Sequence, residues 1–231
     1  MYSGFFKRLI DFVLALIGLI VLLPFFLLVA AAIKLDSSGP VFFKQKRIMR
    51  GGDTFSMLKF RTMRTDTPKD TPTHLLQNPE IYISRVGRVL RKFSIDETIQ
   101  ILHILTGKMS IIGPRPALWN QEDLIELRNE NGANSVRPGL TGLAQISGRD
   151  ELPVEVKARL DGEYAQNLSF LMDLKCFMGT IKSVLKSDGV VEGGTGEYQP
   201  EMVEILDAVE IDAYAQEEEI EADAERSGTN V

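Results

Sequence analysis

The stretch FVLALIGLIVLLPFFLLVAAAI, residues 12–33, contains no charged residue. A helix of this length rises 1.5 Å per residue and can reach across a hydrocarbon core of about 30 Å. The apolar run is longer than the core of a typical signal peptide, and no clear small-residue cleavage site follows it. We therefore expect the segment to be embedded in a membrane and to decide the architecture of the chain.

The charges around this segment predict how it enters the membrane. Lys7 and Arg8 precede it, and five basic residues follow it: Lys34, Lys44, Lys46, Arg47 and Arg50. Both flanks therefore look cytoplasmic by the positive-inside rule. Pro24 removes a backbone donor in the middle of the segment and favours a bend there. A re-entrant helix-hairpin satisfies both observations, and a kinked span is the alternative.

The rest of the chain divides into a basic body and an acidic tail. From Glu192 onward, thirteen acidic residues stand against one basic residue, whereas nineteen acidic and twenty-five basic residues precede it. A basic body suits an anionic partner such as a phosphate or a lipid head group. Cys176 is the only cysteine, and His74 and His103 are the only histidines, which excludes a thiolate or His-rich metal site. His103 is expected to be a packed side chain.

Secondary structure after the membrane segment begins with a predicted hairpin. Residues 41–45 and 54–60 have strand character and are joined by a Gly-Gly-Asp turn. Residues 64–80 are rich in Thr, Pro and Asp and predict a surface loop. The stretch 170–187 is apolar at helical spacing, so it either packs in the core or lies on the membrane surface. Beyond residue 200 we expect an acidic helix and then disorder.

The stretch KFSIDETIQ, residues 92–100, places two carboxylates at a helix start. Ser94 and Glu97 fit a capping box. Apolar residues follow at helical spacing, and Gly107 is a natural stop. Asp96 in the first turn should stay ionised and can lie near a bound phosphate or metal. Adjacent helix residues diverge by about 100°, so Asp96 and Glu97 should have different roles.

Two further stretches hold arginines on rigid backbone. In GPRP, residues 113–116, two prolines fix the chain on either side of Arg115, which predicts either a plain rigid turn or a phosphate-binding fork. VRPGLTGLAQISGR, residues 136–149, places Arg137 and Arg149 around a glycine-containing loop. Neither stretch contains a dinucleotide fingerprint or a P-loop, so no nucleotide-binding fold is implied.

Seven ordered blocks in this chain resemble the bacterial sugar transferase family, and in particular its short monotopic phosphoglycosyl transferases. The blocks are FKRLIDF, PVFFKQKR, LKFRTM, VGRVLRKFSIDETIQ, GKMSIIGPRP, VRPGLTGLAQISGR and LSFLMDLK. The sequence thus predicts an α+β, mostly helical fold. We expect a re-entrant membrane helix-hairpin in residues 1–35, a cytoplasmic catalytic domain in residues 36–190 with a small β-hairpin and interfacial amphipathic helices, and an acidic tail in residues 191–231.

The resemblance implies a reaction at the cytoplasmic face of a bacterial inner membrane. A phosphosugar passes from a UDP-sugar to polyprenyl phosphate, UMP leaves, and glycan assembly begins. The resemblance gives Asp96 the role of nucleophile, through an aspartyl phosphosugar, and makes Glu97 the ligand of Mg²⁺, a hard cation. Arg88 and Arg115, together with Lys59 and Arg137, are the candidates for holding phosphate.

Two departures from the family pattern stand out. Leu23 occupies the position before the kinking proline where the family usually has Ser. Thr98 and Ile99 replace the Leu-Pro that often follows the carboxylate pair. The acidic tail has no counterpart in the family pattern, and we assign it no activity.

A second hypothesis uses the same basic body without catalysis. A membrane scaffold could bind anionic lipid and recruit a partner through its acidic tail. A nucleic-acid binder has no need of residues 12–33, and the chain shows no RRM or zinc-finger pattern, so we expect no nucleic-acid partner. The sequence is compatible with a homo-oligomer and does not specify the sugar.

Overall fold

The computed structural model describes residues 2–67, 79–148 and 152–186. The chain divides into two compact units, residues 1–196 and 197–231, and the described residues all belong to the first. Residues 68–78 of the predicted loop, Arg149 and the acidic tail lie outside the described residues. The domain boundaries at residues 35 and 190 stay predictions.

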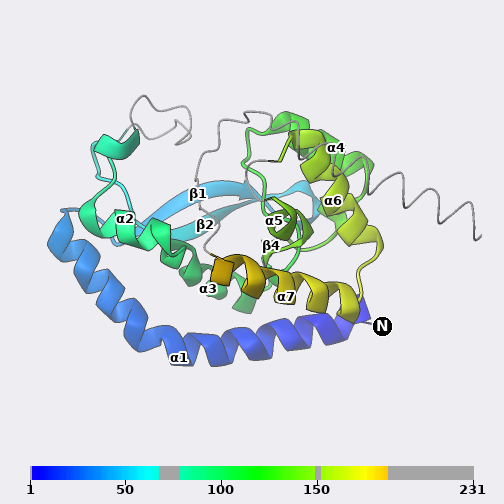
Figure 1. Ribbon diagram of the computed structural model, residues 1–231, viewed down its shortest axis with the longest axis horizontal. Helices are drawn as coiled ribbons and strands as arrows, with labels where there is room; N and C mark the ends of the chain where they lie inside the picture. Colours follow the sequence, from blue (N-terminus) through cyan, green and yellow to red (C-terminus); the bar gives the residue numbers. More distant parts are fainter. Residues whose placement is uncertain (1, 68–78, 149–151, 187–231) are drawn as a thin grey trace, which may run out of the picture. The chain divides into compact units, whose positions relative to one another are not determined.

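The apolar segment forms one long helix. A short π-helical turn, η1 (Tyr2–Phe6), leads into α1 (Lys7–Asp36), which contains Pro24 in its interior. Figure 1 shows α1 as a bent rod along the lower edge of the molecule. The chain stays helical throughout, so the structure shows one bent helix rather than two helices joined by a loop. Residues 4–36 form a helix that is long and apolar enough to cross a membrane.

One face of α1 packs on the rest of the protein. Phe26, Val29 and Ile33 recur at helical spacing and are buried against Phe60 and Leu90. Nearer the N-terminus, Ala15 joins a second cluster of buried side chains, which includes Phe55, Met57, Ile104 and Met109. The opposite face is exposed along most of the helix, for example at Ile20, Val21, Leu27 and Leu28. Such a continuous apolar surface is typical of contact with lipid.

The predicted hairpin is confirmed. Strands β1 (Phe42–Ile48) and β2 (Thr54–Phe60) pair antiparallel, with Phe42 opposite Phe60 and Ile48 opposite Thr54. The first strand ends three residues later than the sequence indicated. Arg50–Gly52, η2, forms the turn, where Gly51 and Gly52 adopt φ values of 84° and 86° that favour glycine.

A second, smaller sheet was missed by the sequence analysis. Strand β3 (Ser110–Ile112) pairs in parallel with β4 (Gly139–Thr141). The two backbone segments approach so closely that a Cβ on Gly113 would lie 2.4 Å from the carbonyl oxygen of Arg137. Strands of three residues carry too little alternation to be recognised from sequence.

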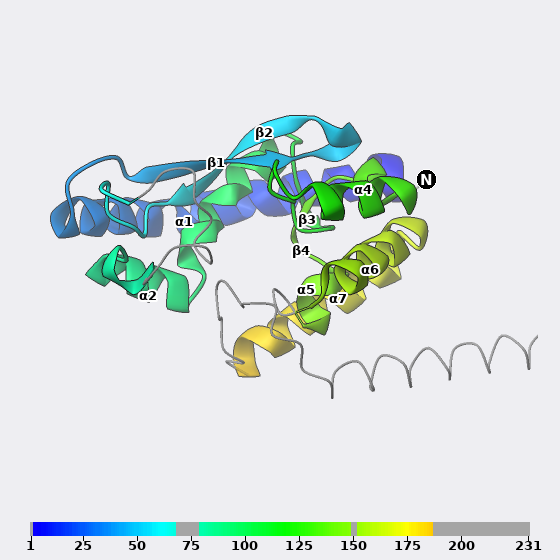
Figure 2. The ribbon, with the colours of Figure 1, turned by 90° about the horizontal axis from the view of Figure 1, so that it is seen from above.

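Helices make up most of the remaining described residues, which confirms a mostly helical α+β fold. Between β2 and β3 lie η4 (Pro79–Ile81), α2 (Arg85–Lys92), η5 (Ile95–Gln100) and α3 (Ile101–Leu105). The second half contains α4 (Glu122–Glu130), η6 (Ala133–Ser135), α5 (Leu143–Ser147), α6 (Val154–Gln166) and α7 (Phe170–Lys186). Seen from above, α1 and α7 meet near the N-terminus and then diverge (Figure 2).

Candidate active site

The carboxylate pair begins a 3₁₀-helix, and the predicted capping box is wrong. Ser94 has a left-handed backbone with φ 52°, and its side chain makes no capping hydrogen bond. The Glu97 carboxylate points to two cations instead of back to the Ser94 amide. The local signal was overridden because charged partners distant in the sequence bind a carboxylate more strongly than a neutral amide does.

Glu97 joins three segments of the chain. Arg115 donates from both terminal nitrogens, with Nη1 2.9 Å from Oε2 and Nη2 2.6 Å from Oε1. Lys59 Nζ lies 2.8 Å from Oε1. A bidentate Arg–carboxylate pair fixes both groups in one plane. The structure therefore brings together three of the predicted site residues, from β2, η5 and the loop after β3; we call Lys59, Glu97 and Arg115 the Glu97 cluster.

The electrostatics keep Glu97 ionised. Burial by itself would raise the pKa of Glu97, because a charged carboxylate loses hydration. The charges and hydrogen bonds of Arg115 and Lys59 outweigh burial and hold this pKa well below its usual range. Glu97 is consequently a fixed negative charge at neutral pH.

Asp96 lies beside this cluster and is buried, with 3% of its surface exposed. A 3₁₀-helix has three residues per turn, so adjacent side chains diverge by about 120°. This geometry turns the Asp96 and Glu97 side chains in different directions, and their different roles stay a prediction. One turn later, Gln100 is also buried, and its Nε2 has no hydrogen-bond partner among the residues that the structure describes. An unsatisfied buried donor near a carboxylate pair suits a polar or anionic ligand.

His103 fixes the strand that carries Lys59. Its Nε2 accepts a hydrogen bond from the Leu58 amide at 2.9 Å, and its ring meets Phe55 edge-on at 5.2 Å. Burial and the charge of Lys108 lower the pKa of His103, which favours the neutral form that can accept this bond. The expected packed histidine is confirmed.

A buried ion pair fixes the backbone of Arg115. Arg128 on α4 donates from Nη1 to the Arg115 carbonyl oxygen at 2.9 Å, and it binds Asp161 of α6 through Nε and Nη2. Both side chains are almost completely buried. The Gly113 amide also donates to the Thr141 carbonyl at 2.8 Å. Arg115 thus projects from a backbone held by prolines, a β-bridge and an ion pair. The sequence analysis missed Arg128 and Asp161, because no local pattern links residues 33 positions apart.

The other two predicted phosphate ligands lie elsewhere. Arg88 is exposed on α2 and makes no ion pair with any described residue. Arg137 donates from Nε to the Gly107 carbonyl at the end of α3, at 3.1 Å. Neither contacts the Glu97 cluster in the described part of the chain. Their roles in phosphate binding stay predictions.

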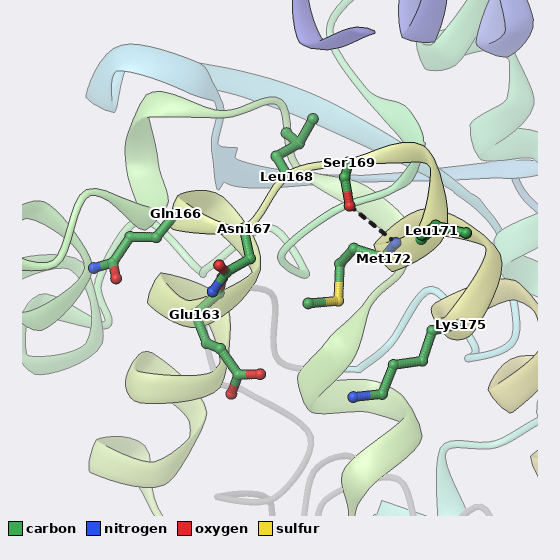
Figure 3. A pocket seen from close by; sticks show the side chains of 8 residues that line it. All are labelled: Glu163, Gln166, Asn167, Leu168, Ser169, Leu171, Met172 and Lys175. Carbon is green, nitrogen blue, oxygen red and sulfur yellow. Dashed lines mark hydrogen bonds between the residues drawn. The ribbon is translucent and has the colours of Figure 1, made fainter. Parts of the chain in front are cut away.

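A groove of about 670 Å³ lies away from these residues, where α6 turns into α7 (Figure 3). It is lined by Glu163, Gln166, Asn167, Leu168, Ser169, Leu171, Met172 and Lys175. Ser169 Oγ accepts from the Met172 amide at 3.2 Å and so caps the start of α7. None of the predicted site residues lines this groove, so it is separate from the carboxylate pair.

The donors suit magnesium only in part. Among the described residues no three His, Cys, Asp or Glu side chains gather as a metal site. Mg²⁺, however, commonly uses one or two carboxylates and takes its other ligands from water and substrate phosphates. Asp96 and Glu97 can supply such oxygens, although Lys59 and Arg115 already occupy part of the Glu97 carboxylate.

Comparison with known proteins defines the class. Residues 2–187 match the model of the bacterial sugar transferase family, and the chain belongs to this family. It is 39% identical to the exopolysaccharide production protein ExoY of Sinorhizobium fredii, over 81% of this chain and 88% of the relative. It is 40% identical to the uncharacterized sugar transferase EpsL of Bacillus subtilis, over 80% of this chain and 89% of the relative. It is also 40% identical to the UDP-glucose:undecaprenyl-phosphate glucose-1-phosphate transferase of Caulobacter vibrioides, over 79% of this chain and 70% of the relative.

Proposed function

We propose that this protein is a phosphoglycosyl transferase that moves a phosphosugar from a UDP-sugar to polyprenyl phosphate and releases UMP. The observation that carries the proposal is the Glu97 cluster, in which two cations bind the carboxylate that directly follows the buried Asp96 in the sequence. The relatives named as UDP-glucose:undecaprenyl-phosphate glucose-1-phosphate transferases make UDP-glucose and undecaprenyl phosphate the first substrates to test. The ExoY relatives are named exopolysaccharide production proteins, which supports a role for this step in exopolysaccharide synthesis.

In the first step, a carboxylate oxygen of Asp96 attacks the phosphorus that carries the sugar. The bond from that phosphorus to the bridging oxygen breaks, and UMP leaves with the electron pair. An aspartyl phosphosugar remains on the enzyme. In the second step, a phosphate oxygen of polyprenyl phosphate attacks the same phosphorus, and the Asp96 carboxylate leaves unchanged. The product is a polyprenyl diphosphate sugar.

The two cations of the Glu97 cluster, whose carboxylate partner is the next residue after Asp96, would favour this attack electrostatically. A carboxylate and a diphosphate repel one another, and fixed positive groups offset that repulsion. The Arg115 side chain is 27% exposed, compared with 14% for Lys59, so a phosphate can reach the arginine from solvent. Asp96 is almost fully buried, which means that surrounding side chains must move for phosphorus to reach it.

Magnesium would be held by a Glu97 oxygen, with water and the diphosphate as further ligands. When bound, Mg²⁺ supplies positive charge that offsets the charge of the diphosphate and the leaving group. Ionised Glu97 is ready for this role at neutral pH, because its pKa is held well below the usual range.

The membrane path that we propose is re-entrant, with the protein at the cytoplasmic face of the inner membrane. Both ends of α1 bind the same folded unit. Near its start, Asp11 accepts from the Ser110 hydroxyl at 2.7 Å and from the Ile111 amide at 3.0 Å. At its end, Asp36 accepts from the Val86 amide at 3.1 Å. A helix anchored at both ends to one domain is favoured to enter and leave on one side.

Helix α7 is the proposed interfacial amphipathic helix. Its outward face exposes apolar side chains, namely Phe170, Leu171, Leu174, Phe177 and Met178, whereas Asp173 and Cys176 are buried. Burial raises the pKa of the Cys176 thiol to about 11. This thiol should therefore react slowly with maleimides.

Transfer is tested by a burst experiment. Purified protein mixed with UDP-glucose and Mg²⁺, without lipid acceptor, should release about one UMP per active site and then stop. Mass spectrometry should find the phosphosugar on the peptide that contains Asp96. Asp96→Asn should abolish the burst, whereas the exposed Asp66→Asn should keep it. UMP release only in the presence of polyprenyl phosphate, without an adduct, would favour direct displacement. A non-catalytic scaffold would tolerate Asp96→Asn.

The membrane path is tested with Gly4→Cys in a Cys176→Ser background. A Cβ at Gly4 meets no atom within 4 Å, so this substitution should not disturb the fold. A membrane-impermeant maleimide should label it only after the cells are opened. If the maleimide labels the introduced thiol from the periplasm of intact cells, α1 spans the bilayer.

A further inference from the structure

Two arginines bind the end of α3 near Gly107, and two further basic residues lie close to them: Lys108 is the next residue, and Arg50 is on η2, which packs against η6 just before Arg137. Arg8 donates to the carbonyl oxygens of Ile104 and Leu105. Arg137 donates to the carbonyl of Gly107 itself. Lys108 follows directly and is exposed, and Arg50 of the β1–β2 turn is also exposed. We call Arg8, Arg50, Lys108 and Arg137 the Gly107 cluster.

Among the described residues, the charges that act on Arg137 are mostly positive. Asp11 is the one acidic group that acts on Arg137, and its two carboxylate oxygens already accept from Ser110 and Ile111. Burial and the like charges of Arg50 and Arg8 lower the pKa of Arg137. Cations held close together in this way are stabilised by a bound anion.

The cluster lies at the level where the membrane segment begins. Arg8 precedes the first residue of the apolar run by one turn, and its guanidinium lies 5.9 Å from the centre of the Phe12 ring. Phe5, Leu9 and Phe12 on the same stretch are 68%, 46% and 42% exposed. Basic groups next to exposed apolar groups match the boundary between lipid phosphates and acyl chains.

We propose that the Gly107 cluster binds the phosphate of an anionic phospholipid headgroup, separately from the Glu97 cluster. Arg137 and Arg8 form its inner part, because both are fixed to carbonyls of the same helix end. Arg50 and Lys108 form its exposed rim. Such a site would hold the start of α1 at the headgroup level and would bind lipid whether or not transfer occurs at Asp96.

The test is lipid binding by the full-length protein in neutral detergent, followed by native mass spectrometry. Phosphatidylglycerol should bind more tightly than phosphatidylcholine. The Arg50→Gln/Lys108→Gln variant should weaken phosphatidylglycerol binding by about thirtyfold, since each basic group near an anionic lipid surface contributes a factor of about five. Both side chains are exposed, so this variant should fold normally.

The matched control is Lys44→Gln/Lys46→Gln, which removes two exposed charges from β1. It should leave the affinity for phosphatidylglycerol within about twofold. Equal weakening by both pairs would overturn the proposal in favour of general surface charge. Displacement of the lipid by millimolar inorganic phosphate would show a simple anion site, and displacement by equimolar polyprenyl phosphate would assign the cluster to the acceptor. Either result overturns the headgroup assignment.

A failure of this experiment would leave the proposed transfer reaction untouched, because lipid binding is read without UDP-sugar. A protein that binds phosphatidylglycerol normally but shows no UMP burst would, conversely, keep the lipid site and reject the transfer.

Discussion

Asp173 and Glu97 each bind a lysine, but the other partners of the two carboxylates differ. Asp173 of α7 accepts from Lys7, Tyr2 and Tyr164, each at 2.6 Å, and the side chains of Lys7 and Asp173 are each 10% exposed. Burial and the Asp173 carboxylate raise the pKa of both tyrosines, so they remain hydrogen-bond donors at neutral pH. This group is closed and ties the N-terminus to α7.

The Glu97 cluster has a different composition. Its carboxylate binds two cations rather than one cation and two neutral hydroxyls, and the Arg115 side chain is 27% exposed. It also adjoins a second carboxylate, Asp96, at a helix start. An ion pair is therefore not by itself a sign of function. Two features distinguish the proposed site from the structural group around Asp173. Its cation Arg115 is partly exposed, and a second carboxylate, Asp96, is next to Glu97 in the sequence.

The largest expected effect on stability is that of Asp173→Ala. This change leaves the buried Lys7 without its charged partner and the Tyr2 hydroxyl without its acceptor, whereas the Tyr164 hydroxyl keeps the Ile112 carbonyl. Breaking the buried ion pair costs about 3–5 kcal/mol. The measurement is the free energy of unfolding in detergent. Asp66→Ala removes an exposed pair with Arg64 and should cost less than about 1 kcal/mol. Equal losses in the two variants would contradict the closed, structural interpretation of Asp173.

Glu97→Gln should lower activity more than stability, unlike Asp173→Ala. The amide keeps an acceptor for Arg115 but loses the charge, so UMP release should fall by about tenfold to a hundredfold, with a smaller loss of stability than in Asp173→Ala. Initial rates at saturating UDP-glucose and thermal unfolding give both quantities. A variant that unfolds readily but turns over normally when folded would place Glu97 with the structural groups.

A third prediction concerns the buried support of Arg115. Replacing both partners, as Arg128→Met with Asp161→Leu, should leave stability within about 2 kcal/mol, because apolar pairs can substitute for buried ion pairs. Turnover should still fall by about tenfold, because the Arg115 carbonyl loses its donor and the guanidinium is less well fixed.

Kinetics of this double variant distinguish positioning from folding. We expect both kcat and the KM for UDP-glucose to change while the unfolding temperature stays close to the wild type. The exposed pair Arg64→Gln/Asp66→Asn is the control and should alter neither. Unchanged kinetics in the Arg128/Asp161 variant would mean that the two prolines alone position Arg115.

The smallest expected effect is a pH dependence that separates His103 from Glu97. The pKa of His103 is lowered in the folded protein, so the unfolded chain binds more protons below about 6.5 and stability falls as the pH drops through that value. Glu97 contributes stability that is present above about 4.3 and is lost only at lower pH, as the pH falls through its lowered folded pKa.

Unfolding free energies measured from about pH 8 down to about pH 2 should resolve the two groups, because the Glu97 contribution is lost only below about 4.3. The side chain introduced by His103→Gln can still accept from the Leu58 amide. This variant should reduce the loss of unfolding free energy near pH 6.5 and leave the loss at lower pH, which is due to Glu97, unchanged. A decline near pH 6.5 that persists in His103→Gln would assign it to another group.

The sequence predicted the elements whose signals are local. Twenty-two uncharged residues indicate an embedded helix in any context. In lipid, the backbone N–H and C=O groups can all be hydrogen-bonded only in a helix or a closed barrel. Alternation around a Gly-Gly-Asp turn predicted the hairpin, with an error of three residues in one strand. The ordered motif blocks identified the family, and the carboxylate pair was placed at a helix start as expected.

Tertiary structure alone decided which charges meet. Lys7 binds Asp173, which is 166 positions away in the sequence. Glu97 binds Lys59 of β2 and Arg115 of the loop after β3 instead of forming its predicted cap. It also separated Arg115 from Arg137, two arginines next to prolines that look alike in the sequence, since the first binds Glu97 and the second binds the end of α3. Periodicity and turn chemistry act within a few residues, whereas the partner of a long charged side chain depends on which segments the packed core brings within about 3 Å of it.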